Sequence, residues 1–339
     1  MDFFRVAQRV LFALDAERAH NIGLSLIRFA SKISAEPMPV VTAVGELSNP
    51  LGLAAGYDKT GRHVNDLARL GFGYVVAGTF TLSPWPGNPK PRVARNKEEQ
   101  TLVNSLGFPN PGIDEFIRNQ VTHRKPETPL IASISGRTLE DVVSVYSKVQ
   151  PHVAGVELNL SSPNTPSLRD LREPPAFAEL AQRLSDAKDK PSYLKIPPYV
   201  DENEFKDTML LVKKWEDLGF EGVTASNSMR IPDERMAIGT GGYSGPPLIE
   251  HTKAAVEKIR KSVDSSFEIN AVGGISSPTD AAALLGMGAT TVQLFTALVY
   301  QGPALVKSII TDPGVRQVID ARSSSTLSEP PPKATKKRG

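Results

Sequence analysis

Small hydrogen-bonding side chains are concentrated in one short stretch of the chain, VELNLSSPNTPSLRDL, at residues 156–171. The alternation in VELNL indicates a buried β-strand. Amides and hydroxyls follow at its downstream end: Asn159, Ser161, Ser162, Asn164 and Thr165. These uncharged side chains donate and accept hydrogen bonds, so the stretch is typical of a binding site for a planar polar ligand.

Similar side chains follow the other apolar runs of the chain. They are Asp58 and Lys59, Thr79, Ser133, Lys195, Ser226 and Asn227, Gly273 and Gly274, and Phe295 and Thr296. Asp58 is the only carboxylate immediately at the end of a run, and all histidines lie elsewhere. This pattern argues against a catalytic metal, a Ser-His-Asp triad or the carboxylate pair of a glycosidase. It favours a neutral-to-anionic ligand. Amides would hold this ligand, and Lys59 and Lys195 would balance its negative charge.

The apolar runs themselves alternate with helical segments, which predicts a parallel sheet. The runs are LGLAA (51–55), GYVVAG (73–78), PLIASI (129–134), GVELNL (155–160), SYLKI (192–196), GVTASN (222–227), EINAVG (268–273) and TVQLFT (291–296). Eight such units predict an α/β fold, the (β/α)8 TIM barrel, whose active site lies at the C-terminal ends of the strands. The Pro/Gly-rich insert from Phe80 to Thr128 is expected to form a hairpin or lid over the barrel mouth.

Gly273 and Gly274 follow the seventh run and are candidates for a phosphate site. A glycine pair alone is more often part of a turn, but loops after strands seven and eight of a barrel often bind phosphate through backbone N–H groups. A phosphate site, a lysine and a metal-free polar cavity together predict a phosphate-bearing cofactor. Flavin mononucleotide (FMN) fits, because Lys195 would stabilise the charge that the flavin gains on reduction. The competing interpretation of Lys195 is the Schiff-base lysine of a barrel aldolase.

Residues 1–38 are predicted to form a helical pair that joins near Asp15. In the first helix apolar residues recur with helical spacing. In the second, one apolar stripe comprises Ile22, Leu26, Phe29 and Ile33. The pair either packs on the main domain or lies as an amphipathic platform in a membrane interface.

The remaining chain divides into the barrel at residues 39–322 and a Ser/Pro/Lys-rich tail at residues 323–339, which is predicted to be disordered. The 39 Lys and Arg against 37 Asp and Glu give a net charge of +2, which is too balanced to predict a nucleic-acid partner. The absence of Cys excludes disulfides, thiolate metal sites and a cysteine base. No apolar run approaches the ~20 residues of a spanning helix.

Ordered motifs over nearly the whole chain resemble dihydroorotate dehydrogenase. They are LDAERAH (14–20), NPLGLAAGYDKTG (49–61), PGNPKPRVAR (86–95), NSLGFPNPG (104–112), ELNLSSPNTPSLR (157–169), YLKIPP (193–198), TASNS (224–228), GGYSGPPL (241–248), AVGGISS (271–277) and VQLFTAL (292–298). The resemblance implies an FMN-dependent barrel that oxidises (S)-dihydroorotate to orotate in pyrimidine biosynthesis.

The resemblance also implies separate roles for residues within these motifs. Ser162 matches the catalytic base. The substrate positions match Lys59, Asn104, Asn159, Asn164, Asn227 and Ser228. The FMN positions match Ala55, Gly56, Thr79, Asn159, Lys195, Ser226, Gly245, Gly274, Phe295 and Thr296. Because a serine hydroxyl is a weak base, we expect the proton to leave through an ordered water or a neighbouring hydroxyl such as Thr165.

The electron acceptor follows from the class within the family. Soluble members have Cys where this chain has Ser162, whereas Ser162 and the N-terminal helical pair resemble the membrane-associated, quinone-reducing class. His20 and Arg95 match positions of the quinone site, although each also fits a structural role, as a satisfied polar residue and an ion pair. This class implies peripheral attachment to the cytoplasmic face of the inner membrane in a bacterium, or to the mitochondrial inner membrane in a eukaryote.

Some motifs depart from that class. NSLGFPNPG, YLKIPPYVD and VELNL are closer to the soluble class, which keeps a fumarate-type acceptor, another pyrimidine substrate or a catalytically silent flavin protein as alternatives. Ser133 stands where the family usually has Asn, and Phe295 replaces a commoner Tyr. The loss of the amide at residue 133 predicts weaker or altered substrate binding.

Overall fold

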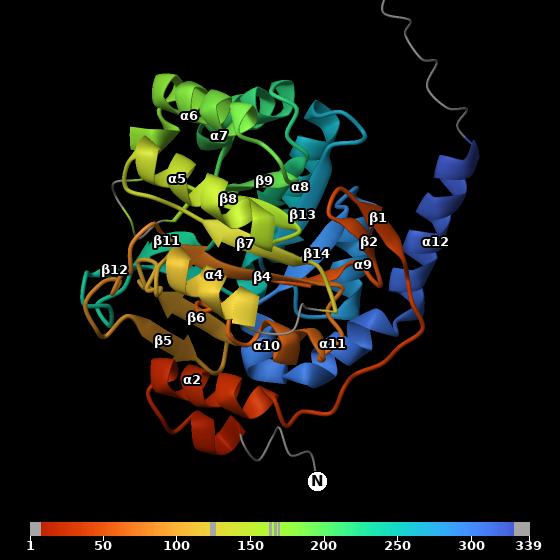
Figure 1. Ribbon diagram of the computed structural model, residues 1–339. Coiled ribbons are helices and arrows are strands. Elements are labelled where there is room, and N and C mark those ends of the chain that lie inside the picture. The colour runs from red at the N-terminus through yellow and green to blue at the C-terminus, as the bar shows by residue number, and fades with distance from the viewer. Residues whose placement is uncertain (1–7, 123–126, 163–164, 166–167, 169, 329–339) are drawn as a thin grey trace, which may run out of the picture.

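Eight parallel strands close into a barrel at the centre of the structure, a computed structural model that describes residues 8–122, 127–162, 165, 168 and 170–328 (Figure 1). In chain order they are β3 (Leu51–Leu53), β4 (Tyr74–Phe80), β7 (Leu130–Ile134), β8 (Gly155–Asn159), β9 (Ser192–Ile196), β10 (Gly222–Ala225), β13 (Glu268–Val272) and β14 (Thr291–Leu294). Each one lies within or overlaps a predicted run, so the predicted TIM barrel is confirmed. Around the barrel the order is β10-β13-β14-β3-β4-β7-β8-β9.

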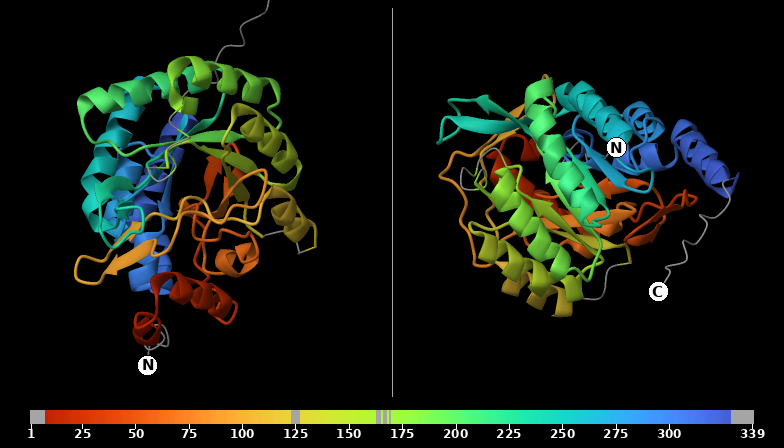
Figure 2. Two further views of the ribbon diagram at one scale, coloured as in Figure 1. Left: turned by 90° about the vertical axis from the view of Figure 1, so that its left-hand side faces the viewer. Right: turned by 90° about the horizontal axis from the view of Figure 1, so that it is seen from above.

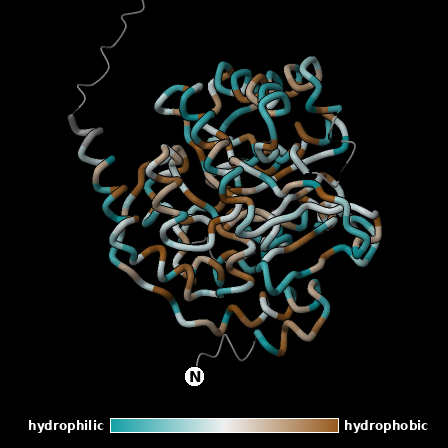
Figure 3. The backbone as a smooth tube through the Cα atoms, turned by 180° about the vertical axis from the view of Figure 1, so that it is seen from behind, coloured by the Kyte–Doolittle hydropathy of each residue, from teal (hydrophilic) through white to brown (hydrophobic). Residues whose placement is uncertain are grey.

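Helices follow the strands and surround the barrel (Figure 2). They are α3 (Val64–Ala68), α4 (Ile113–Thr122), α5 (Leu139–Val149), α6 (Pro174–Asp186), α7 (Glu202–Asp217), α8 (Ile249–Ser262), α9 (Pro278–Gly286), α10 (Thr296–Gln301), α11 (Pro303–Ile310) and α12 (Pro313–Ser328). Side chains at their starts accept backbone N–H groups, as Thr138 does for Asp141 and Ser277 for Asp280. Teal and brown positions alternate along the helices in Figure 3, as expected where one face of each helix is buried.

A short hairpin closes the N-terminal end of the barrel. Its strands are β1 (Val40–Thr42) and β2 (Gly45–Leu47), and Leu47 is buried among the side chains inside the barrel. The backbone N–H of Ala43 donates to Glu268 at 2.6 Å, and Tyr193 donates to the other carboxylate oxygen at 2.8 Å. The hairpin was not predicted, because strands of this length carry too little periodicity to be recognised.

A second, four-stranded sheet is formed by two hairpins outside the barrel. Its order is β11-β12-β6-β5, from β11 (Met229–Pro232), β12 (Thr240–Ser244), β6 (Thr101–Asn104) and β5 (Val93–Asn96). The hairpin expected within the long insert is therefore present. β12 was not predicted as a strand, and its Gly242 pairs with Asn104 of the insert. Glycine lowers local strand propensity, so this strand depends on its tertiary partner.

The N-terminal helical pair is present within the described residues, with helical residues 8–11 and α2 (Ala16–Ile27). In Figures 1 and 2 it lies beside β5. The predicted stripe was wrong beyond Ile27, because α2 ends there and Ile33 instead packs against the buried core. The N–H of Ile33 donates to the carbonyl of Arg69 at 2.9 Å, so tertiary pairing replaces the helical period.

The C-terminal helix α12 continues beyond residue 323, where the disordered tail was predicted to begin. The hydroxyls of Ser323 and Ser324 donate to the carbonyls of Ile319 and Asp320, at 3.1 and 3.0 Å. Serine that bonds back to the carbonyl four residues earlier is compatible with a helix, although it favours one weakly. The rest of the predicted tail, residues 329–339, lies outside the described residues.

Candidate active site

One cavity of about 420 Å³ extends from the C-terminal ends of the barrel strands to the N-terminal helices. The predicted site residues that line it are His20, Ala55, Gly56, Lys59, Thr79, Arg95, Asn104, Asn159, Ser162, Lys195, Ser226, Asn227, Ser228, Gly245, Gly274, Phe295 and Thr296. Asn164 lies outside the described residues. The structure therefore brings the other predicted residues together around one space.

Asn159, at the end of β8, is held by a chain of hydroxyl groups. Its Nδ2 donates to Thr79 Oγ1 at 3.1 Å, and Thr79 Oγ1 lies 3.1 Å from Ser133 Oγ. Ser133 is fully buried behind Thr79 and does not line the cavity. The hydroxyl of Ser133 therefore supports Thr79, which leaves Thr79 and Asn159 to face a ligand.

A second amide, Asn227, follows β10 (Gly222–Ala225) and meets the end of β8. Its Nδ2 donates to Ser161 Oγ at 3.0 Å and lies 3.5 Å from Asn159 Oδ1. Its own Oδ1 accepts from the backbone N–H of Ser228 at 2.8 Å. These bonds fix which end of each amide is the donor, so the pair presents a defined hydrogen-bonding pattern to a flat polar ring.

The loop after β3 carries Lys59 next to a fully buried carboxylate. Asp58 accepts the backbone N–H groups of Thr60, Gly61 and His63 at 3.0, 2.8 and 2.8 Å. Charge-assisted bonds of this kind hold the turn rigidly. Burial lowers the pKa of Lys59 to about 8. None of the described carboxylates forms an ion pair with the Lys59 ammonium, which faces the cavity and suits an anionic ligand.

Two glycines line the cavity, Gly274 after β13 and Gly245 after β12. At Gly274, with φ +78°, an added Cβ would lie 2.2 Å from the backbone nitrogen of Ile249. At Gly245, with φ +124°, it would lie 2.8 Å from the carbonyl oxygen of Gln100. Neither position accepts a side chain, so backbone lines this part of the cavity. This is the place where barrels bind phosphate on N–H groups.

Lys195, on β9, points into the same cavity from inside the barrel. Its side chain is only 6% exposed, and its Nζ lies 3.8 Å from Glu157 Oε1. Gln293 also lines the cavity, and its buried Oε1 accepts no hydrogen bond from the described residues. A bound heterocycle that carries N–H groups and gains negative charge would satisfy both side chains. The residues present therefore fit a flavin.

Ser162 lies on the loop after β8 and lines the cavity. Its Oγ lies 3.3 Å from Thr165 Oγ1, and either hydroxyl can be the donor. The neighbouring hydroxyl expected from the sequence is therefore within hydrogen-bonding distance. Among the described residues no group of three or more His, Asp or Glu side chains is arranged to hold a metal ion.

A family profile described as dihydroorotate dehydrogenase matches residues 40–313 of the chain. The chain belongs to the dihydroorotate dehydrogenase family. It is 33% identical over 335 residues to the dihydroorotate dehydrogenase (quinone) of Stenotrophomonas maltophilia strain K279a, with 91% of this chain and 95% of the relative covered. It is 34% identical over 333 residues to the enzyme of the same name from Neisseria gonorrhoeae, with 91% of this chain and 98% of the relative covered.

Solved structures agree with this membership of the dihydroorotate dehydrogenase family. The crystal structure of ligand-free DHODH from Eimeria tenella superposes with a TM-score of 0.79 at 25% identity, and 87% of this chain and 93% of that chain are covered. The family consists of flavin-dependent oxidoreductases, so the chain is an oxidoreductase of a barrel fold. The Schiff-base aldolase interpretation of Lys195 is thereby excluded.

At the far end of the cavity His20, on α2, contacts the barrel. Its Nε2 donates to the carbonyl of Tyr57 at 2.8 Å, because a carbonyl can only accept. Burial lowers the pKa of His20 to about 3, so the ring is neutral and its Nδ1 is an acceptor. The rings of His20 and Tyr57 lie 5.1 Å apart, and those of Tyr57 and Phe295 lie 5.4 Å apart. A row of rings thus joins α2 to the end of β14.

Arg95 has structural partners as well as a place in the cavity wall. Its guanidinium donates to the carbonyls of Leu11 and Leu14, and it stacks 4.7 Å from the ring of Phe12. The residue therefore ties the end of the first helix to β5. This contact to carbonyls differs from the ion pair considered as a structural alternative for Arg95.

Several residues that line the cavity were not predicted as site residues. They include Glu17, Tyr57, Phe108, Leu248, Gln293 and Val299. Tyr57 lies inside the recognised motif AAGYDKTG, which was the available signal for it. Glu17 lies inside the recognised motif LDAERAH in the same way. Val299 lies on α10, just after the motif VQLFTAL (292–298), so no motif marked it.

Proposed function

We propose that the protein oxidises dihydroorotate to orotate with bound FMN and transfers the electrons to a quinone at a membrane surface. The observation that carries this proposal is the single cavity, which joins the amide and serine groups at the barrel mouth to an apolar region under α2. One end suits a small polar substrate, and the other suits an apolar acceptor. A flavin between the two ends could exchange electrons with both.

The barrel end offers what dihydroorotate requires. The substrate has a carboxylate, for which Lys59 supplies a cation, and ring amides, for which Asn104, Asn159 and Asn227 supply donors and acceptors. Asn164 and Ser228 are proposed to complete this set. FMN, when bound, would supply the acceptor for the hydride of C6. Ser162 takes the proton from C5 while it passes its own hydroxyl proton to Thr165 Oγ1, and Thr165 in turn releases a proton to water.

For FMN, the proposed contacts divide between its phosphate and its ring. Gly245 and Gly274 provide a backbone wall for the phosphate, with Thr296 nearby, whose hydroxyl donates to Ser244 at 2.9 Å. Lys195 and Thr79 lie toward the barrel interior and would contact the ring, where charge and hydrogen bonds tune its electronics. The remaining proposed contacts are Ala55, Gly56, Asn159, Ser226 and Phe295.

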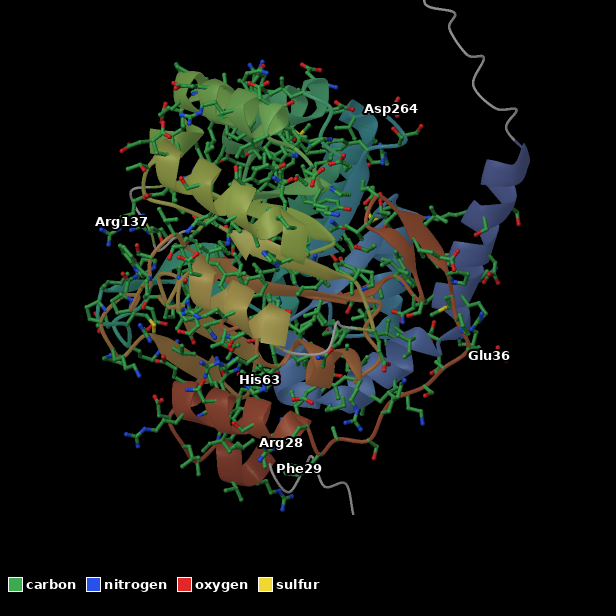
Figure 4. All side chains as sticks on the ribbon, viewed as in Figure 1. Arg28, Phe29, Glu36, His63, Arg137 and Asp264 are labelled. Atoms are coloured by element: carbon green, nitrogen blue, oxygen red, sulfur yellow. The ribbon has the colours of Figure 1, made fainter. Side chains whose placement is uncertain are left out.

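The N-terminal pair is proposed to attach the protein to a membrane and to admit quinone. Its exposed apolar side chains are Val10, Leu14, Ile22, Leu26 and Phe29. Phe29 is 71% exposed, and the guanidinium of Arg28 lies 4.8 Å from its ring, at the edge of the molecule in Figure 4. Apolar residues beside cations suit an interface with anionic lipid. In the described part of the chain no helix is long and apolar enough to span a membrane.

Attachment to a membrane implies the location expected for the quinone-reducing class of the family. The proposed site is the cytoplasmic face of the inner membrane in a bacterium, or the mitochondrial inner membrane in a eukaryote. His20 and Arg95 line the part of the cavity under α2 and are proposed to border the quinone path.

The absorption spectrum of the purified protein tests cofactor and substrate together. We expect a yellow protein that releases FMN on denaturation and bleaches when dihydroorotate is added without oxygen. Steady-state turnover with a ubiquinone analogue should then exceed turnover with fumarate. A flavin that does not bleach would contradict dihydroorotate as the substrate. Turnover with fumarate alone would contradict a quinone as the electron acceptor.

The pH dependence of substrate capture tests Lys59. Because burial lowers the pKa of Lys59 to about 8, the free enzyme loses this positive charge as the pH rises through that value. We expect kcat/KM for dihydroorotate to fall about tenfold per pH unit above about 8. Lys59→Arg should remove this decline, because arginine stays protonated. An unchanged profile in Lys59→Arg would show that another group titrates.

A further inference from the structure

The barrel interior contains a carboxylate, Glu157, directly behind Lys195. Glu157 lies on β8, its side chain is 1% exposed, and its Oε1 is 3.8 Å from the Lys195 ammonium. Neither carboxylate oxygen accepts a hydrogen bond from the described residues. Buried carboxylates are normally hydrogen-bonded, since burying a charge is costly. Lys195 is thus the partner that compensates this charge.

Strand register places the carboxylate one layer below the cavity. Asn159 is the register partner of Lys195, and Glu157 lies two residues earlier on the same strand, so it points to the same side. Lys195 lines the cavity and Glu157 does not. From the cavity into the barrel, the order is therefore the ligand, the Lys195 ammonium and then the Glu157 carboxylate.

The neighbouring interior positions carry no charge. Thr224 is the register partner of Lys195 on β10, and Asn270 is the partner of Thr224 on β13. Gln293, on β14, lines the cavity and is also uncharged. Since these groups are neutral, Glu157 is the carboxylate within 4 Å that offsets the Lys195 charge among the described residues.

We propose that Glu157 is a positioning residue that holds Lys195 against the flavin and lowers the reduction potential of that flavin. The proposal rests on the proposed binding of FMN next to Lys195. A flavin gains negative charge on reduction, and a nearby cation favours that state. A carboxylate behind the cation weakens this effect, and the low-dielectric interior makes the interaction strong. The ion pair therefore limits how easily the flavin accepts two electrons.

Replacing Glu157 by glutamine keeps the shape and removes the negative charge. In Glu157→Gln the ammonium is no longer offset, so the reduced flavin should bind about tenfold more tightly relative to the oxidised flavin. For a two-electron couple, that tenfold change is a rise in midpoint potential of about 30 mV. The potential should rise and not fall, because the charge that is removed is negative.

A matched control is available at the other end of the barrel interior. Glu268 is also a largely buried carboxylate, but it lies two residues before Asn270 on β13 and is hydrogen-bonded to Tyr193 and Ala43. Glu268→Gln removes the same charge at a greater distance from Lys195. We expect its midpoint potential to remain that of the unchanged protein.

The experiment uses the full chain with bound FMN and measures the midpoint potential by equilibration with reference dyes. A rise in Glu157→Gln without one in Glu268→Gln supports the proposal, whereas equal potentials in all three proteins overturn it. If Glu157→Gln does not fold, Glu157→Met, of similar size and without charge, should give the same rise. A wild-type protein without FMN would contradict the proposed function itself. A wild-type protein that bleaches normally, with no shift in the variants, contradicts only the role of Glu157.

Discussion

Replacing Ser162 by alanine should slow the reduction of bound flavin by dihydroorotate about 10²–10⁴-fold, the range that a general base contributes. The Ser162 hydroxyl faces the cavity and lies 3.3 Å from Thr165 Oγ1, so the two form a path for the C5 proton. Alanine removes the first acceptor of that path and leaves the glycine loops at Gly245 and Gly274 unchanged. FMN content should therefore be that of the unchanged protein. Anaerobic stopped-flow absorbance at saturating dihydroorotate measures the rate.

Two variants separate the base from its surroundings. Ser162→Cys should recover part of the rate as the pH rises toward the thiol pKa of about 8.5, because a thiolate is the stronger base. Ser161→Ala changes the adjacent serine, which accepts from Asn227 at 3.0 Å and does not line the cavity. It should raise the KM for dihydroorotate more than it slows reduction. A normal rate in Ser162→Ala would remove this residue from the role of base.

The barrel could be predicted because its strands are buried on both faces. Strands such as β7 (Leu130–Ile134) and β9 (Ser192–Ile196) are short runs in which every residue is buried, and such runs differ clearly from the polar helices around them. In a barrel the C-terminal strand ends indicate where polar residues should gather. For Asn159, Lys195 and Asn227, the amino-acid sequence alone is therefore enough to predict a place at the barrel mouth.

The elements that escaped prediction depend on tertiary partners. β12 contains Gly241 and Gly242 and becomes a strand by pairing with Asn104 of a distant hairpin. The apolar stripe of α2 continues in the sequence beyond Ile27, but Ile33 instead pairs with the carbonyl of Arg69. In both places a contact far along the chain decides the conformation, and local periodicity does not reveal such a contact.

The candidate site shows the same difference between features that one motif carries and features that depend on a distant partner. The predicted residues of the recognised motifs that the structure describes line one cavity, whereas pairs between motifs were not foreseen. Glu17 is part of the LDAERAH motif and Arg92 is part of PGNPKPRVAR, yet nothing in either motif indicates that the two side chains meet. That contact connects the helical platform to the barrel, and it leads to a second large effect.

Replacing Arg92 by alanine should lower the free energy of unfolding by about 3 kcal/mol, as expected when one partner of a buried ion pair is removed. The Arg92 side chain is 8% exposed and binds Glu17 of α2 through two bonds, at 2.6 and 3.1 Å. It also donates to the carbonyls of Pro86 and Asn88 at 2.6 and 3.0 Å. Alanine removes the donor from both carbonyls and leaves the Glu17 carboxylate with the exposed Lys90 as its cation. Urea unfolding measures the loss.

Lys90→Ala is the matched control, because Lys90 is 3.3 Å from the same Glu17 carboxylate but 67% exposed. An exposed pair of this kind contributes about 0–1 kcal/mol. Burial raises the pKa of Glu17, but the Arg92 hydrogen bond and charge outweigh it and hold that pKa below its ordinary value. The stabilisation by the pair is therefore present above the unfolded pKa of Glu17, and it is lost as the pH falls through the lower folded value. In Arg92→Ala this acid-side loss should disappear.

The same substitution distinguishes the two ends of the cavity. Arg92 is not part of the proposed substrate or FMN contacts, but it anchors α2, which carries His20 and forms the wall of the proposed quinone path. At a temperature where the variant stays folded, flavin reduction by dihydroorotate should be nearly unchanged, while reoxidation by a ubiquinone analogue should be slower. Equal losses in both half-reactions would instead mean that α2 supports the whole barrel site and has no separate role toward quinone.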